Sequence, residues 1–510
     1  MPGENKRIAV NTMFIYFKMI VVTVVGLFTT RYVLLGLGVS DYGLYNVVGG
    51  LLAMLNIFST AMHTTTRRYI NVEMGKPDGN INKVFNISLL IHVGFALLTL
   101  LLAETFGLFY IYNYLNVEPG KLGDALFVFE ISTLTAMVGL INIPYQAVLN
   151  AHENFKQIAL IDIAQVVLKL PLVLMLVSYE GNHLRFYAIG MCVLNLFVMF
   201  AFAALSYIKY NSEIRLKIFH DKPLYREILI FNGYTASGAA VSVVKNQGAT
   251  MVANFFFGTI VNGALALAYQ VERYIQLLVA NLATSSAPQI TQSYSKGDYE
   301  RTQTLAEAIG KYMVLLMTIM VTAVACELEF IMTVWLKIIP EGALLLCQWI
   351  MLSLYFRSFD SCISTVLIAN GRLKETTITT TALGIGYPVV LFVLLKVGFP
   401  PATVIVLTAL LEMANKWVNL YILHRISHFR VGHYLKTVYP RVLVVGILCG
   451  LFYFMRMQLN FAGIEAHLFS FCIAGLFALI VCFIVGLNSR ERVILINNAR
   501  KFVDKIKKKN

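Results

Sequence analysis

Charged residues are scarce in this chain, and their scarcity decides its broad class. Asp, Glu, Lys and Arg make up 13% of the 510 residues, whereas soluble domains carry about 25%. Hydrophobic residues make up 58% of the chain, and the mean hydropathy is +0.71. A soluble protein of several domains is therefore excluded, and the composition predicts a polytopic membrane protein.

Signatures of catalysis and of cofactor binding are also missing. The chain has no GxxxxGK[ST] phosphate loop and no dinucleotide fingerprint, so we do not expect it to hydrolyse ATP. Its seven cysteines fall at unrelated spacings, with no CxxC and no Cys/His cluster. We therefore expect no metal, no cofactor and no enzymatic activity.

Acidic residues are fewer than basic ones, 27 against 41, which gives a net charge of +14. Such a charge can indicate a nucleic-acid partner. The basic residues here lie in short loops and in the C-terminal tail, however, and form no long basic surface. We therefore predict no nucleic-acid partner.

Apolar runs fill most of the chain. A bilayer core of about 30 Å needs roughly 20 apolar residues per helix, and fourteen segments satisfy this. The predicted spans are 11–35, 42–66, 84–111, 124–149, 157–178, 184–208, 227–256, 263–287, 306–335, 342–369, 376–397, 402–424, 438–456 and 466–487. Most Lys and Arg outside them share one side, so both termini are predicted to be cytoplasmic.

An internal repeat relates the two halves of the chain. Residues 21–78 align with 241–298 without a gap, pairing Gly38 with Gly258, Gly43 with Gly263 and Asp78 with Asp298. Repeats of this kind are typical of transporters. The predicted parts are a six-helix lobe (1–208), a basic cytoplasmic linker (209–226), a second six-helix lobe (227–424), two additional helices (425–487) and a basic tail (488–510).

Three segments resemble the Wzx-type polysaccharide and O-antigen flippases of the multidrug/oligosaccharidyl-lipid/polysaccharide exporter superfamily. The stretch Gly38–Tyr45 is similar to their G-x-x-(D/E)-Y-G turn. The run QITQSYSKGD after Pro288 is similar to their P-x-(I/L)-(S/T)…G-(D/N) loop, and Asn150–Leu174 to their fourth loop and fifth helix. The resemblance covers the whole chain through span number, repeat and loops.

This resemblance implies a V-shaped, MATE-like pair of six-helix bundles in the bacterial cytoplasmic membrane. It implies that undecaprenyl-diphosphate-linked oligosaccharide, a precursor of O-antigen and lipopolysaccharide, is flipped by alternating access. Implied partners are the lipid-linked glycan, membrane lipid, and polysaccharide polymerase and assembly proteins. The two extra helices depart from the usual twelve and are similar to those thought to house the lipid tail in lipid II flippases. A lipid II-type flippase and a cation-coupled multidrug exporter are therefore the alternatives.

Seven of the basic residues inside the predicted spans are expected to lie at membrane depth. Each costs roughly 2.5–3.5 kcal/mol at the centre of a membrane helix, so they indicate an anionic substrate or a structural partner. Three have an acid on the same helix face: Arg357 with Asp360, Lys416 with Glu412, and Lys169 with Asp162. The remaining four, Lys18, Arg31, Lys245 and Arg273, are predicted to line a cationic cavity for the diphosphate.

Other charged residues are assigned weaker roles. Arg31 could instead snorkel to the outer interface. Arg67 and Arg68 are candidates for capturing the headgroup, or are plain positive-inside residues. Glu327 lies near an outer end, where solvation would suffice. Four acids are candidates for ion coupling: Glu130, Asp162, Glu272 and Asp360.

Overall fold

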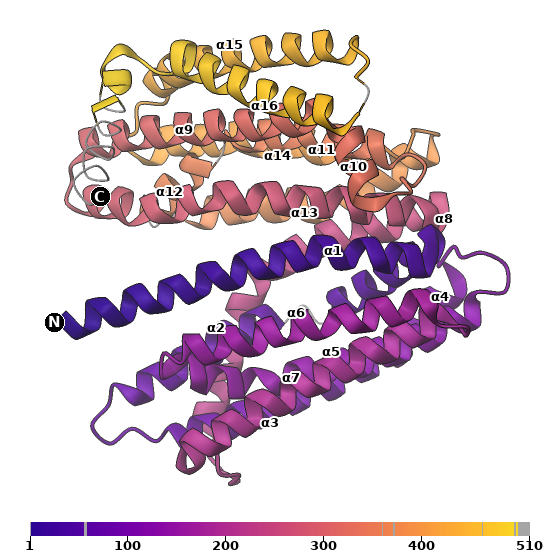
Figure 1. Cartoon of the computed structure of the whole chain (residues 1–510). Helices are drawn as coiled ribbons and strands as arrows, with labels where there is room; N and C mark the ends of the chain where they lie inside the picture. The colour runs from indigo at the N-terminus through magenta and orange to yellow at the C-terminus, as the bar shows by residue number, and fades with distance from the viewer. Residues whose placement is uncertain are drawn as a thin grey trace, which may run out of the picture. The chain divides into compact units, whose positions relative to one another are not determined.

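The computed structural model describes residues 2–55, 59–359, 361–370, 373–461, 463–493 and 496–497. Helix accounts for 87% of these described residues, and no strand occurs among them, so the predicted all-helical class is confirmed. The helices are α1 (Pro2–Leu55), α2 (Ser59–Met74), α3 (Ile81–Leu102), η1 (Ala103–Gly107), α4 (Leu108–Asn113), α5 (Leu122–Ala151), α6 (Phe155–Ser178), α7 (His183–Ile214), α8 (Lys222–Ser295), α9 (Tyr299–Cys326), α10 (Leu328–Leu336), α11 (Ala343–Arg357), α12 (Ser361–Asn370), α13 (Leu373–Lys396), α14 (Thr403–Ile426), α15 (Val431–Met457), α16 (Ile464–Val481) and η2 (Cys482–Gly486). Figure 1 labels the α-helices.

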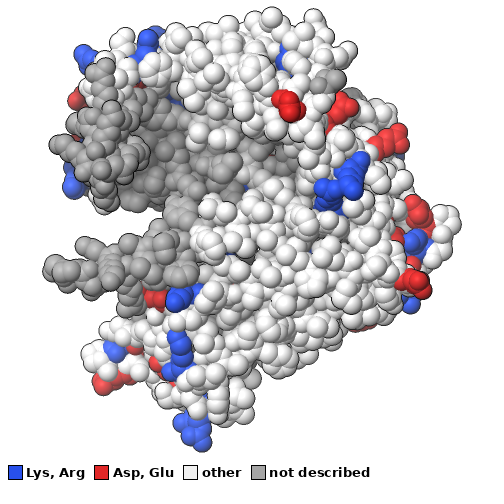
Figure 2. Space-filling view, viewed as in Figure 1, with Lys and Arg blue, Asp and Glu red and all other residues white. Residues whose placement is uncertain are grey.

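Many of these helices are suited to a membrane. Among the described residues, ten helical segments are long and apolar enough to cross a bilayer. On the face that Figure 2 shows, most charged side chains lie near helix ends, and the surface between them is almost uncharged. A multi-pass membrane protein is therefore supported, whereas the count of fourteen spans remains a prediction.

The helices pack into two units. Unit 1 comprises 1–266, 335–342 and 384–401, and unit 2 comprises 267–334, 343–383 and 402–510. In unit 1, α1 packs on α6, and α5 packs on α3 and α7. In unit 2, α9 packs against α15, α16, α11 and α12. The predicted lobes, linker, additional helices and tail remain predictions, because the packing units divide α8 and α13 internally.

Two glycines bend the longest helices at equivalent places in the repeat. Gly38 interrupts α1 with φ 76° and ψ 172°, and Gly258 interrupts α8 with φ 74° and ψ −168°. A positive φ is costly for residues with a Cβ and readily adopted by glycine. The predicted turn after the first span is therefore a sharp bend at one glycine, and its counterpart repeats it 220 residues later.

A second pair of glycines lets these two bends touch. A Cβ on Gly43 would lie 1.8 Å from the carbonyl oxygen of Thr259, and one on Gly263 would lie 2.8 Å from that of Val39. The Oγ atoms of Ser40 and Thr259 are 2.9 Å apart. Val39 and Thr259 are themselves 220 residues apart, so equivalent segments of the two repeats meet backbone to backbone. We call this contact the glycine crossing.

The loop motif that ends in Gly297–Asp298 has a structural explanation. Gly297 has φ 74°, and the Asp298 N–H donates to the Ser293 carbonyl, which closes α8 in a Schellman-type cap. The Asp298 carboxylate then accepts from the Arg301 N–H and caps α9. In the first half Asn80, not Asp78, caps the next helix. The pairing of Asp78 with Asp298 was therefore wrong, because the offset shrinks there by two residues.

Candidate functional site

Lys18 is paired inside unit 1. Its Nζ lies 2.5 Å from Oδ2 of Asp162, which α6 presents to α1, and both side chains are partly buried. The sequence suggested Lys169 as the partner of Asp162 and left Lys18 uncompensated. Pairing across helices corrects that interpretation, because spacing along one helix cannot reveal an acid 144 residues away. Lys18 therefore forms a neutral pair rather than a surplus positive charge.

Three other cations lie within the apolar helices of unit 1. Arg31 and Lys245 are both half-buried, on α1 and α8. The ammonium of Lys169 lies 5.9 Å from the centre of the Tyr187 ring. These positions keep Arg31 and Lys245 as candidates for binding an anionic headgroup.

Unit 2 holds an arginine between two glutamates. Arg357, at the end of α11, forms an ion pair with Glu272 of α8, and its Nε lies 2.6 Å from Oε2 of Glu412 of α14. Gln276 donates a further hydrogen bond to Glu272 at 3.0 Å. The sequence paired Arg357 with Asp360, which lies outside the described residues. Because Glu272 and Glu412 both pair with Arg357, a structural role for Glu272 is an alternative to the predicted role in ion coupling.

Lys416 sits among aromatic rings in unit 2. Its side chain is buried, with Nζ 4.3 Å from the centre of the Phe359 ring and 4.7 Å from that of Tyr439. Ring faces attract a cation, and more strongly where water is excluded. The rings of Phe359, which follows α11, and Tyr439 of α15 therefore stabilise the charge of Lys416, in addition to the predicted pairing with Glu412 one turn away.

The remaining predicted site residues are distributed over both units. Arg273 is exposed in unit 2, and Glu130 is exposed on α5 of unit 1. Arg67 and Arg68 are exposed on α2, where the guanidinium of Arg68 lies 4.4 Å from the centre of the Phe231 ring. The shared cationic cavity therefore remains a prediction.

Two buried ionic clusters were not predicted from the sequence. The first centres on Lys311 of α9, which is 3% exposed and whose Nζ lies 2.5 Å from both carboxylate oxygens of Glu491. Glu491 and Asn488 also cap each other's backbone N–H groups. Burial opposes ionisation, but Lys311 and the Asn488 N–H hold the pKa of Glu491 below its usual value. In the sequence, the only indication of this arrangement was the run NSRE at 488–491, which has the spacing of a capping box.

The second cluster corrects the expectation that Glu327 is solvated. Its side chain is 1% exposed, and Arg456 of α15 approaches Oε1 through Nε at 2.7 Å and a terminal nitrogen at 2.6 Å. His467 of α16 lies 2.7 Å from Oε2. Glu327 caps the C-terminus of α9, where the helix dipole disfavours an acid. The two basic groups offset that penalty.

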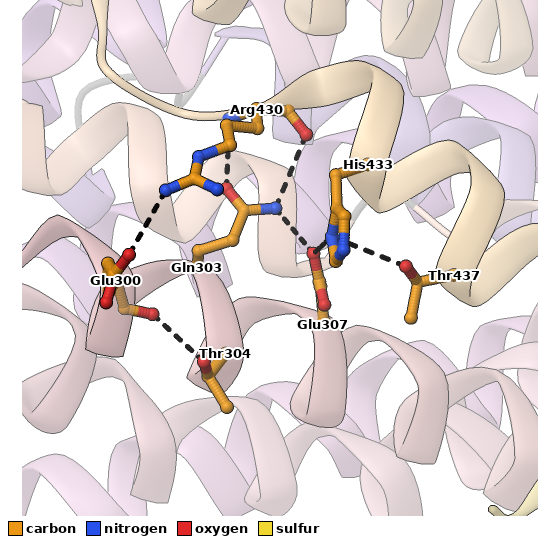
Figure 3. A network of polar contacts seen from close by, with 7 residues as sticks. All are labelled: Glu300, Gln303, Thr304, Glu307, Arg430, His433 and Thr437. Atoms are coloured by element: carbon orange, nitrogen blue, oxygen red, sulfur yellow. Dashed lines mark hydrogen bonds and ion pairs between the residues drawn. The ribbon is translucent and has the colours of Figure 1, made fainter.

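A third contact fastens the other end of α15. In the network of Figure 3, Gln303 accepts from the Arg430 N–H at 3.0 Å and donates to Glu307 at 2.6 Å. His433 also contacts Glu307, at 2.7 Å. Because α9 thus binds both ends of α15 and the chain after α16, the last two helices form a fixed part of unit 2.

An apolar cavity of about 660 Å³ lies between α9, α11 and α15 of unit 2. Its lining includes Thr318, Trp349, Tyr355, Ile447 and Tyr453. Gly446 and Gly450 of α15 line it as well. Among the described residues, no group of His, Cys, Asp and Glu could hold a metal ion. The lining of this cavity suits an apolar ligand.

Solved structures of similar fold are membrane transporters. The lipid II flippase MurJ, in an inward closed conformation, matches with a TM-score of 0.68 and 15% identity over 93% of this chain and 98% of that chain. The chain has the fold of these transporters. An inward-facing multidrug resistance MATE family transporter of the MOP superfamily matches with a TM-score of 0.61 and 13% identity, covering 81% and 99%.

A third match is a MOP superfamily transporter from Pyrococcus furiosus described by the reverse polarity of its binding pocket. Its TM-score is 0.51 and its identity 12%, covering 84% of this chain and 96% of that chain. No known protein family and no curated protein matches the sequence. At these identities the likeness establishes the fold, while the activity has to be argued from the residues.

Proposed function

We propose that this protein flips an undecaprenyl-diphosphate-linked oligosaccharide across the bacterial cytoplasmic membrane by alternating access. The observation that carries the proposal is a set of cations in membrane-depth helices of a transporter fold. Arg31, Lys169 and Lys245 lie in the apolar helices of unit 1, as does Lys18, which pairs with Asp162. Cations at that depth are expensive and normally serve a substrate or a partner.

The chemistry of the cargo fits these residues. A diphosphate offers oxygens that a guanidinium can bind through two parallel hydrogen bonds, whereas an ammonium acts as a point charge. Arg31 and Lys245, in unit 1, would hold the diphosphate, and Arg273, in unit 2, is a further candidate for binding phosphate. Arg67 and Arg68, exposed on α2, would meet the headgroup first. An inside-negative potential favours outward movement of the anion by about 2.3 kcal/mol per charge per 100 mV.

The lipid tail needs an apolar path of its own. The cavity of about 660 Å³ beside α15 is large enough to hold several isoprene units and is bounded mostly by apolar side chains. The ionic contacts of α9 with Glu491, Arg456 and His433 would keep its walls in place. This supports a lipid-linked substrate over a small soluble one.

The glycine crossing supplies a place to bend. Residues 259–266 of α8 belong to unit 1, and the helix enters unit 2 at Leu267. Gly38 and Gly258 bend the two helices, and Gly43 and Gly263 bring their backbones together. We propose that α1 and α8 bend at this contact within unit 1 during transport, because close backbone contact leaves no side chains interlocked between the two helices.

A lipid II-type cargo is the second candidate. The likeness to MurJ covers 93% of the chain, against 81% for the multidrug transporter. A cation-coupled drug exporter is less favoured, because Arg357 engages both Glu272 and Glu412. The proposal includes a Wzx-type flippase and its partnership with polysaccharide polymerase and assembly proteins.

Complementation tests the cationic residues. In a flippase-deleted strain, Arg31→Ala, Lys245→Ala and Arg273→Ala should each reduce surface glycan at least several-fold, because each removes a phosphate contact. Lys396→Ala is the matched control, since Lys396 is exposed at the end of α13. Arg31→Lys should keep partial activity. Undiminished glycan in all three alanine variants, at equal protein level, would refute the cationic site.

A further inference from the structure

The connection between α7 and α8 exposes two large apolar side chains outside any helix. Leu216 is 70% exposed and Ile218 is 76% exposed. Arg215 and Lys217, which alternate with them along the chain, are exposed as well. In a loop surrounded by water, exposing two large apolar side chains would be unfavourable. We call residues 215–218 the connection segment.

The connection segment is held in place by α3. Asn82 donates to the Arg215 carbonyl at 2.7 Å, and Asn86 donates to the same oxygen at 2.9 Å. Asn86 in turn accepts from the Lys217 N–H at 3.0 Å. Two asparagine side chains thus fix the backbone that carries Leu216 and Ile218.

Ion pairs secure the chain on either side of the segment. Before it, Glu213 lies 2.8 Å from His152, whose ring stacks on Tyr210 with centroids 3.9 Å apart. After it, Asp221 lies 2.5 Å from Lys83 and accepts from the Leu224 N–H at the start of α8. The segment is therefore presented in one geometry.

The contacts with α3 also give its depth. Asn82 and Asn86 are the second and sixth residues of α3, and the apolar span that includes α3 begins at Ile81. At 1.5 Å per residue, these anchors lie within about 8 Å of the end of the span. The segment therefore lies at one end of this apolar span, where lipid headgroups are expected. There, apolar side chains can enter lipid while basic ones remain among phosphates.

We propose that the connection segment is a membrane-surface anchor for anionic phospholipid. Leu216 and Ile218 insert among the acyl chains, and Arg215 and Lys217 bind headgroup phosphates. Alternating basic and apolar residues suit a charged lipid surface better than a protein groove, because both kinds of side chain are satisfied at one interface. The proposal is independent of the transported cargo, since it concerns the outer surface of unit 1.

An environment-sensitive fluorophore tests insertion. It is encoded genetically at position 216 of the full-length protein, which leaves the native cysteines in place, and the protein is reconstituted in nanodiscs of phosphatidylcholine alone or mixed with phosphatidylglycerol. Position 78, exposed in the α2–α3 loop near the same end of α3, is the aqueous control. We expect blue-shifted emission and strong quenching by spin-labelled acyl chains at 216, and neither at 78.

Charge variants test the headgroup part. Phosphatidylglycerol should increase quenching at 216 at least twofold, and Arg215→Gln with Lys217→Gln should abolish that increase while leaving thermal unfolding unchanged. Equal, water-like emission at 216 and 78 would overturn the anchor. So would quenching that ignores lipid charge, or an increase that survives the double variant. Reversal by inorganic phosphate at constant ionic strength would indicate a free-anion site instead.

Discussion

At the scale of single residues, the buried charges of this chain are balanced mainly by partners on other helices. Lys18 pairs with Asp162, Arg357 pairs with Glu272, and Lys311 pairs with Glu491. The sequence identified which cations had to be explained, because an apolar run makes any charge conspicuous. It could not identify partners more than 80 residues away, because spacing along a helix reports only neighbours on its own face.

Arg456 should be the costliest of these charges to remove. Arg456→Ala leaves Glu327 buried beside His467 alone, and breaking a buried pair typically costs about 3–5 kcal/mol. Thermal unfolding in detergent should show a clear fall in Tm. The double variant Glu327→Gln, Arg456→Gln should recover much of that loss, because no uncompensated charge remains.

Lys436→Ala, at an exposed position of α15, is the matched control and should leave Tm unchanged. A Tm for Arg456→Ala equal to that of the parent would show that Glu327 is not held by its ion pair.

Asp221 should make the start of α8 sensitive to acid. The hydrogen bond from Lys83 holds the pKa of this carboxyl below its ordinary value of 3.8. A depressed carboxyl pKa stabilises the folded state above the unfolded value, and the gain disappears as pH falls through the folded pKa. The Tm difference between the parent and Asp221→Asn should therefore be constant from about pH 8 to 5 and vanish in stronger acid. A difference that grows on acidification would contradict this account.

At the scale of elements, the glycine bends were the most predictable features. The motif around Gly38 indicated a turn, and the repeat placed its counterpart at Gly258; both have positive φ. Asp298 was recognised within a motif, but its role as the cap of α9 emerged only from the structure. The contact of Gly43 with Thr259 was not predictable, because an alignment of repeats does not reveal that the repeats touch.

Gly43→Ala tests the glycine crossing. The added methyl would lie 1.8 Å from the Thr259 carbonyl oxygen, so the two backbones must separate. Transport measured by complementation should be lost, and Tm should fall. Gly49→Ala on the same helix is the control, because nothing lies within 4 Å of its Cβ position. Normal transport in Gly43→Ala would rule out bending at the crossing as part of transport.

At the scale of the whole molecule, the chain is a multi-pass helical protein with the fold of MurJ and MATE transporters. Composition predicted the membrane class, because 13% charged residues cannot cover a soluble protein of 510 residues. Short loop motifs, through the resemblance they carry, predicted a MATE-like fold. The cargo could not be predicted, since substrate specificity depends on a few polar side chains whose spacing is set by packing.

Flipping by the purified protein is the most direct measurement of the central claim. Full-length protein in liposomes would receive a fluorescent undecaprenyl-diphosphate oligosaccharide, and a membrane-impermeant reductant would report the fraction in the outer leaflet. We predict that the wild type exposes inner-leaflet substrate to reduction several-fold faster than Arg31→Ala or protein-free liposomes, while a neutral polyprenyl glycoside gains nothing. Equal rates for wild type, variant and protein-free liposomes would contradict the account.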